Sequence, residues 1–289
     1  MKKDAFSAFH PLVNFVFFVL AIGFGVVIQH PAYLAVGFLA SGVYYLLLHR
    51  GKGIRMILGL IPLFLVMSLI NPIFNTRGQQ VLFTYFSRPY TLEALYHGMA
   101  VAAVFVVMFL WFGCYSAVLT SDKFVCLFGG LIPSLSLLLV MVLRMIPNLI
   151  KKARQILGAR RGIGKGAGDN ASAKEKLHHS ALALSALTDW ALEGSIVTAD
   201  SMRSRGYGTA RRTSFHLWKM QKADWQILLL QILLAVLTVL PGGMAAVYTP
   251  ALSIAFPTWG LAFYGILLFL PSILHVKEVL AWRFFISKI

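Results

Sequence analysis

The sequence is poor in charge, and the shortage falls mainly on the acidic side. Of its 289 residues only 12% are charged, and 10 Asp and Glu stand against 26 Lys and Arg, so the formal net charge is +16. Soluble domains are about 25% charged and about 45–50% apolar, whereas 58% of this chain is hydrophobic. These values exclude an ordinary cytosolic enzyme and a disordered protein.

Cysteines and the motifs of cofactor binding are scarce as well. Cys114 and Cys126 both have apolar neighbours, so neither a disulfide framework nor a metal-ligand spacing is indicated. The Gly-rich stretch is not a P-loop, because Lys165 is followed by glycine and a helix, not a strand, is expected before it. His178 and His179 diverge on a helix and have no third ligand nearby, so we interpret them as part of a solvated helix start. We therefore expect no catalytic residue, no cofactor and no bound metal.

Long apolar runs are what the sequence has in abundance. A membrane-spanning helix needs about 20 mostly apolar residues, with a range of about 17–25. Six runs reach or approach this length, namely residues 12–28, 32–48, 54–70, 98–119, 225–240 and 257–274. A seventh run, residues 131–143, is shorter, and we expect a buried or half-inserted helix there. The sequence thus predicts an all-α polytopic membrane protein with about six transmembrane helices.

The positive charges indicate which side of the membrane each loop faces, because Lys and Arg collect in short cytoplasmic loops. Lys2 and Lys3 place the N-terminus inside, and Lys277 and Lys288 do the same for the C-terminus. Residues 144–222 hold 15 of the 26 Lys and Arg and 5 of the 10 acids, a net charge of +10, and are expected in the cytoplasm. We expect a multi-pass protein of the plasma (inner cell) membrane with both termini cytoplasmic. It has four spans in residues 1–130, a cytoplasmic helical domain in residues 131–222, and two spans in residues 223–289.

The cytoplasmic domain is predicted to contain two long amphipathic helices. The first covers residues 144–161, with Arg144 and Pro147 in its first turn, where proline is tolerated. The second covers residues 177–205 and is rich in alanine, serine and glycine, which let helix backbones approach closely. Asp200 and Arg203 are three residues apart, so they can pair on one face of this helix.

Both predicted helices end in arginine followed by glycine, as Arg160-Arg161-Gly162 and Ser204-Arg205-Gly206. A single case is ordinary, because glycine caps helix C-termini and arginine complements the helix dipole. Two cases in one membrane protein favour a shared role. An arginine at a helix end can project into a groove of a partner protein, where its planar fork finds carboxylates or carbonyl oxygens.

Taken in order, these motifs resemble those of the transmembrane T component of energy-coupling factor (ECF) transporters, over nearly the whole chain. The motifs are His10-Pro11, His30-Pro31, Arg144-Met145-Ile146-Pro147, Ala159-Arg160-Arg161-Gly162, and residues 201–208 (SMRSRGYG) followed by Arg212-Thr213. The resemblance implies a non-catalytic subunit of an ATP-driven importer for a micronutrient, either a vitamin or a transition-metal ion such as cobalt or nickel.

The same resemblance implies partners and roles for particular residues. Two cytoplasmic ABC-type ATPases would power transport, and a membrane-embedded S component would bind and select the substrate. The two cytoplasmic helices would be coupling helices, with Arg161 and Arg205 each entering a groove of one ATPase. The first triplet has Arg160 where the family commonly has Ala, so either Arg160 or Arg161 is the inserting residue. The Gly-rich stretch after it is longer than usual.

Two other functions are compatible with the composition. A self-contained secondary transporter would need broken helices and polar residues at mid-membrane, yet no acid lies in the middle of a clear apolar run. A membrane anchor could use its basic section to bind anionic lipid or nucleic acid. We expect contact with membrane lipids and none with nucleic acid.

Overall fold

The computed structural model of the chain describes residues 4–49, 51–76, 78–85, 88–129, 133–164, 166, 172–209, 218–248 and 252–286. Contacts between residues divide the chain into two compact units. The first comprises residues 1–124 and 218–289 and is called the bundle below. The second comprises residues 125–217 and is called the two-helix unit.

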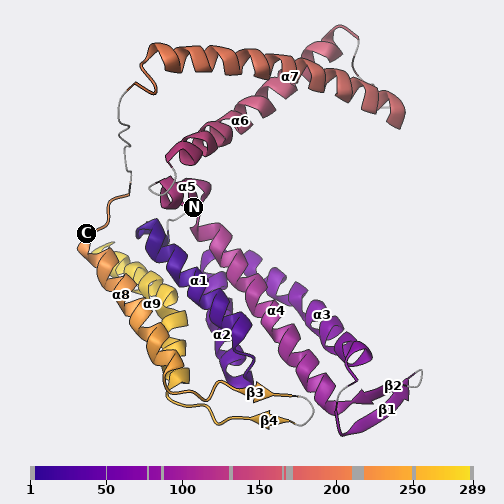
Figure 1. Cartoon of the computed structure of the whole chain (residues 1–289), viewed down its shortest axis with the longest axis vertical. Helices are drawn as coiled ribbons and strands as arrows, with labels where there is room; N and C mark the ends of the chain where they lie inside the picture. The colour runs from indigo at the N-terminus through magenta and orange to yellow at the C-terminus, as the bar shows by residue number, and fades with distance from the viewer. Residues whose placement is uncertain are drawn as a thin grey trace. The chain divides into compact units, whose positions relative to one another are not determined.

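The bundle consists of long apolar helices (Figure 1). Helix α2 packs against both α4 and α9, while α3 packs on α4, and α8 lies beside α9 and α1. The bounds are α1 Pro11–Val27, α2 Pro31–His49, α3 Gly51–Phe74, α4 Leu92–Val118, α8 Lys222–Val239 and α9 Gly260–Ile286; a short α5, Ser121–Gly129, follows α4.

These helices indicate a multi-pass membrane protein. Among the described residues, five helices are long and apolar enough to cross a membrane, namely α2, α3, α4, α8 and α9. Helix α1 is equally apolar but has only 17 residues, at the short end of the spanning range. Each of the six predicted apolar runs therefore corresponds to a helix. The first two runs are joined by a tight turn, since α1 ends at Val27 and α2 begins at Pro31.

Two short β-hairpins, which were not expected, interrupt the helical pattern. Strands β1 (Val81–Tyr85) and β2 (Arg88–Thr91) pair between α3 and α4, and strands β3 (Ala246–Val247) and β4 (Ser253–Ile254) pair between α8 and α9. Both hairpins lie at the end of the bundle away from the N-terminus (Figure 1). The exposed connections satisfy part of their backbone hydrogen bonding within these hairpins.

Aromatic side chains form the centre of the bundle. Phe6, Phe17, Phe18, Tyr44 and Trp111 are each at most 1% exposed. Their rings meet edge to face, for example Phe6 with Phe17 at 5.2 Å between centroids and Phe17 with Trp111 at 5.5 Å. Such pairs contribute about 0.5–1.5 kcal/mol each beyond the burial of area. They hold α1, α2 and α4 around the short 3-10 helix η1 (Phe6–Ala8).

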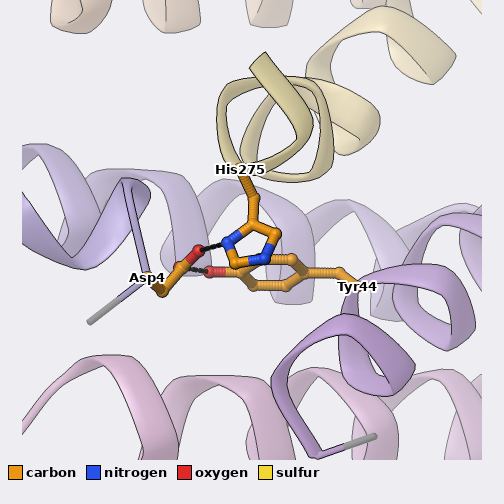
Figure 2. A network of polar contacts seen from close by, with 3 residues as sticks. All are labelled: Asp4, Tyr44 and His275. Carbon is orange, nitrogen blue, oxygen red and sulfur yellow. Dashed lines mark hydrogen bonds and ion pairs between the residues drawn. The ribbon is translucent and has the colours of Figure 1, made fainter. Parts of the chain in front are cut away.

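Buried polar groups fasten the N-terminal segment to this core. The carboxylate of Asp4 accepts a hydrogen bond from the Tyr44 hydroxyl at 2.5 Å and lies 2.6 Å from Nδ1 of His275, so it joins α2 to α9 (Figure 2). Lys123, 3% exposed, donates to the carbonyl and hydroxyl of Ser7 and to the carbonyl of Val118. Because a buried charge without partners costs several kcal/mol, these contacts make the segment an integral part of the fold.

The two His-Pro dipeptides begin helices in the same way. Nδ1 of His10 accepts from the backbone N–H of Leu12, and Nδ1 of His30 accepts from that of Ala32, both at 3.2 Å. In each case proline occupies the first helical position, where no donor is needed. Burial lowers the pKa of His10, an effect that the nearby Asp224 carboxylate partly opposes. The neutral imidazole required for the cap is therefore favoured.

The two-helix unit contains α6 (Pro133–Gly162) and α7 (Ala173–Ser204), with 30 and 32 residues. Helix α7 begins with a capping box, in which the side chains and backbone N–H groups of Ser172 and Glu175 bond reciprocally. The predicted division at residue 144 is wrong, because α6 runs unbroken through it. Pro147 consequently lies inside α6 rather than in a first turn. Leu138 and Val142, in the stretch expected to be buried or half-inserted, are 58% and 48% exposed, so the two-helix unit itself does not bury them.

Candidate functional site

Helices α6 and α7 cross each other within the two-helix unit (Figure 1). Two polar contacts mark the crossing. The ammonium of Lys152 lies 5.5 Å from the ring centroid of Trp190, and the guanidinium of Arg160 donates to Nδ1 of His179 at 3.4 Å. Between them, Ala183 is only 8% exposed. The residue numbers rise on α6 as they fall on α7, so the helices are antiparallel over this stretch.

Small residues line only part of this contact. Of the alanines, serines and glycines expected on the second helix, Ala183 is buried and Ala191 and Gly194 are half-buried. Ala181, Ser185, Ala186, Ser195 and Ala199 are exposed. Of these small residues Ala183 is thus the one buried in the helix contact, where a small side chain lets helix backbones approach closely, and most of the others remain accessible on α7.

The C-terminus of α6 differs from the expected arrangement. Gly162 is the last helical residue and has an ordinary helical backbone, whereas the glycine with positive φ (71°) is Gly164. The N–H of Gly164 bonds to the carbonyl of Arg161 at 3.1 Å. The prediction that Gly162 caps the helix is thus wrong, because the helix continues through Gly162 and Gly164 has the left-handed capping conformation.

The C-terminus of α7 follows the expected arrangement closely. Arg205 is the C-cap and Gly206 has a φ of 76°. The N–H of Tyr207 bonds to the carbonyl of Met202 and the N–H of Gly206 to that of Arg203, both at 3.0 Å. These two bonds form a Schellman motif, which ends the helix immediately after Ser204 and fixes the backbone at Arg205.

The arginines of the two triplets have different surroundings. Arg160 is half-buried and engages His179 in the crossing, whereas Arg161 is exposed. Arg205 is also exposed. Of the two candidates in the first triplet, Arg161 is therefore the one whose side chain is accessible to a partner. The contact between Arg160 and His179 could not be foreseen, because the two residues are 19 positions apart and no local pattern links them.

The supporting residues contribute less than expected. Asp200 and Arg203 are both exposed, and the described part of the chain shows no ion pair between them. Arg144 is exposed on α6. Pro147 has no N–H, so the carbonyl of Leu143 one turn earlier lacks its usual helical partner. Arg212 and Thr213, which complete the motif after the second triplet, lie outside the described residues.

Apolar side chains remain exposed along both helices. They are between 42% and 72% exposed and include Ile146, Ile150 and Leu157 on α6, and Leu177, Leu184, Leu192, Ile196 and Val197 on α7. Two crossing helices cannot cover their own apolar faces, and exposed patches of this kind mark interaction surfaces. Residues 144–222, which include α7 and most of α6, carry the +10 charge noted above.

The described residues contain no group of three or more His, Cys, Asp and Glu side chains arranged to hold a metal ion. Comparison of the sequence with protein-family models and with curated proteins finds no match. The arrangement of α6 and α7 therefore carries the functional interpretation.

Proposed function

We propose that this protein is the transmembrane T component of an ECF-type ABC importer. The observation that carries the proposal is the crossed pair of helices α6 and α7, each with an accessible arginine near its C-terminus. In this role the protein is a non-catalytic subunit. It couples ATP hydrolysis by two cytoplasmic ATPases to micronutrient uptake through an S component.

The separation of the two arginines supports two distinct partners. Arg161 follows Arg160, which contacts His179 on α7. Arg205 lies 26 residues beyond His179, which corresponds to about 39 Å of helix at 1.5 Å per residue. This length exceeds the roughly 30 Å diameter of a small domain. Each arginine thus reaches a separate ATPase subunit, and a movement of one subunit relative to the other turns the crossed helices.

The partner groove would be lined by acidic side chains or carbonyl oxygens. A guanidinium forms two parallel hydrogen bonds with a carboxylate, and these bonds are strong when water is excluded. The Schellman motif at Arg205 supplies a defined starting geometry for such a contact. The exposed apolar faces of α6 and α7 provide the remaining contact area, toward the ATPases and the S component.

The membrane arrangement in this proposal has six spans. Helix α1 is included because 17 residues reach across about 26 Å, and the bilayer can thin locally to match a short helix. In this arrangement both termini and the two-helix unit lie in the cytoplasm, on the inner side of the plasma membrane, and the distribution of Lys and Arg supports this orientation.

The test replaces Arg161 or Arg205 by glutamate and measures co-purification with the ATPase subunits of the same cell, together with ATP-driven uptake. Loss of one buried interface charge costs about 2–5 kcal/mol, which weakens association about 30-fold or more, since 1.4 kcal/mol is tenfold. Lys151→Glu on α6 and Lys174→Glu on α7 are matched controls, because both lysines are exposed and lie away from the C-terminal helix ends that carry Arg161 and Arg205.

Three results would contradict the proposal. Wild-type co-purification and uptake in both arginine variants would remove the coupling role. Uptake in cells lacking every ABC ATPase would identify a self-contained transporter. Loss of function when Lys151, Lys152 and Arg154 are neutralised, but not in the Arg161 or Arg205 variants, would identify a basic membrane anchor.

A further inference from the structure

The connection between α8 and α9 is unusual for a loop at the surface of a membrane protein. From Trp225 to Val276 the sequence contains no Asp, Glu, Lys or Arg, so α8 beyond its first turn, the hairpin, and α9 as far as Val276 are uncharged. Loops that face water normally contain charged residues. The composition of this connection instead matches the helices on either side of it.

The most exposed apolar side chains of the bundle gather at the same end. In the described part of the bundle, five large hydrophobic side chains are more than 70% exposed, and each lies at or beyond the end of a helix on the side of the two hairpins: Val27, Phe74, Leu240, Phe256 and Trp259. Phe256 is 92% exposed and Trp259 is 82% exposed.

The β3–β4 connection is held firmly, so this exposure belongs to the fold. The hydroxyl of Tyr248 donates to the carbonyl of Gln29 at 2.6 Å, and Nε2 of His30 donates to the carbonyl of Ala255 at 2.8 Å. The ring of Tyr248 is 4% exposed and packs on α2 and α4. The segment carrying Phe256 and Trp259 is thereby fixed to the turn between α1 and α2.

A shallow, wide-open apolar groove of about 540 Å³ includes Trp259 in its lining. It is lined by Val36 of α2, by Leu261 and Ala262 in the first turn of α9, and by residues 257–259. The one polar side chain in this lining, Thr258, donates its hydroxyl to the carbonyl of Gly242 at 2.7 Å. The groove therefore offers an apolar surface at the point where two candidate spans begin.

We propose that this groove holds an acyl chain of a membrane phospholipid and that Phe256 and Trp259 insert at the boundary between headgroups and acyl chains. Tryptophan concentrates at this depth because its ring is apolar and its N–H can reach polar headgroups. An acyl chain is uncharged, which suits the apolar lining of the groove, and it is flexible enough to follow the groove's shape. A soluble protein partner would instead be expected to meet polar or charged rim residues, which this connection lacks.

The lipid site requires only that the bundle lies in a membrane, so it is independent of the coupling role. The test places the full chain in nanodiscs of phosphatidylethanolamine and phosphatidylglycerol, some of whose acyl chains are brominated near the headgroup. Subtracting the emission of the Trp259→Phe variant from that of the wild type isolates Trp259. We expect acyl-chain bromine to quench this emission and aqueous iodide to have no effect on it.

A second measurement examines the groove itself. Ala262→Phe fills it, and Ile266→Phe adds the same ring one turn along α9, at an exposed position outside the groove lining. Mass spectrometry of the detergent-extracted protein should show one phospholipid fewer on Ala262→Phe than on Ile266→Phe or the wild type. Equal lipid content in all three would overturn the groove assignment.

Quenching of Trp259 by iodide, with none by bromine, would overturn the whole proposal. If that iodide quenching disappeared in native membranes, a protein rather than lipid would cover Trp259 and the groove.

Discussion

Removing a single oxygen atom from Tyr44 tests whether the network at Asp4 stabilises the bundle. The Tyr44 side chain is fully buried, and its hydroxyl donates to the Asp4 carboxylate at 2.5 Å. Tyr44→Phe keeps the ring contacts with Phe6 and Trp111 but leaves one carboxylate oxygen without its donor. A hydrogen bond to a charged group contributes about 1.5–3 kcal/mol. We therefore expect the folded-to-unfolded ratio to fall about 10- to 100-fold.

The measurement is the free energy of unfolding in mixed micelles of mild detergent and SDS, followed by circular dichroism. Tyr45→Phe is the matched control, because the same atom is removed from the next residue of the same helix. Among the described residues, the hydroxyl of Tyr45 donates to the thioether of Met56, which is a weak acceptor. Its loss should cost less than about 1 kcal/mol.

A double-mutant cycle separates this hydrogen bond from changes in packing. In an Asp4→Ala background the acceptor is already gone, so Tyr44→Phe should cost almost nothing there. The reasoning is refuted if Tyr44→Phe is no more destabilising than Tyr45→Phe, or if its cost persists in the Asp4→Ala background.

Two further predictions concern helix ends. Gly206→Ala should destabilise the last turn of α7 by about 1–2 kcal/mol because the φ of Gly206 is 76°. Gly162→Ala should instead stabilise α6 by about 0.5–1 kcal/mol because Gly162 is helical. Amide hydrogen exchange at the two helix ends measures both effects, and equal effects would contradict the prediction. Burial lowers the pKa of His10 from its ordinary 6.5, so its stabilising contribution should be present above about pH 6.5 and lost as the pH falls below that value, where the unfolded chain takes up the proton. His10→Asn keeps an acceptor for the cap and should flatten this part of the pH–stability curve; an unchanged curve would contradict the prediction.

The predicted spans agree with the helices to within a few residues at most ends, because a spanning segment must be both apolar and helical. The run at residues 12–28 became α1, Pro11–Val27. Helix α9 continues to Ile286, well past the predicted end at residue 274, since amphipathic sequence beyond a membrane run can remain helical. The β1–β2 hairpin was missed although Val81–Tyr85 is rich in residues that favour strands.

The coupling helices were harder to delimit. Pro147 and Arg144 were interpreted as a helix start, yet α6 passes through both, because one missing backbone hydrogen bond does not end a helix of 30 residues. Gly162 was interpreted as a cap, yet Gly164 has the left-handed backbone. Both errors arise because a residue that permits a helix end does not require one.

Composition and spacing were sufficient to establish a helical membrane protein and to locate two basic helices, because apolar length and charge distribution are properties of local sequence. They could not show that Asp4 meets Tyr44 and His275, which are 40 and 271 positions away. Nor could they separate Arg161 from Arg160, since that difference depends on His179 across the crossing. Such contacts arise only when distant segments pack together, and packing determines which polar groups are buried with a partner and which remain accessible.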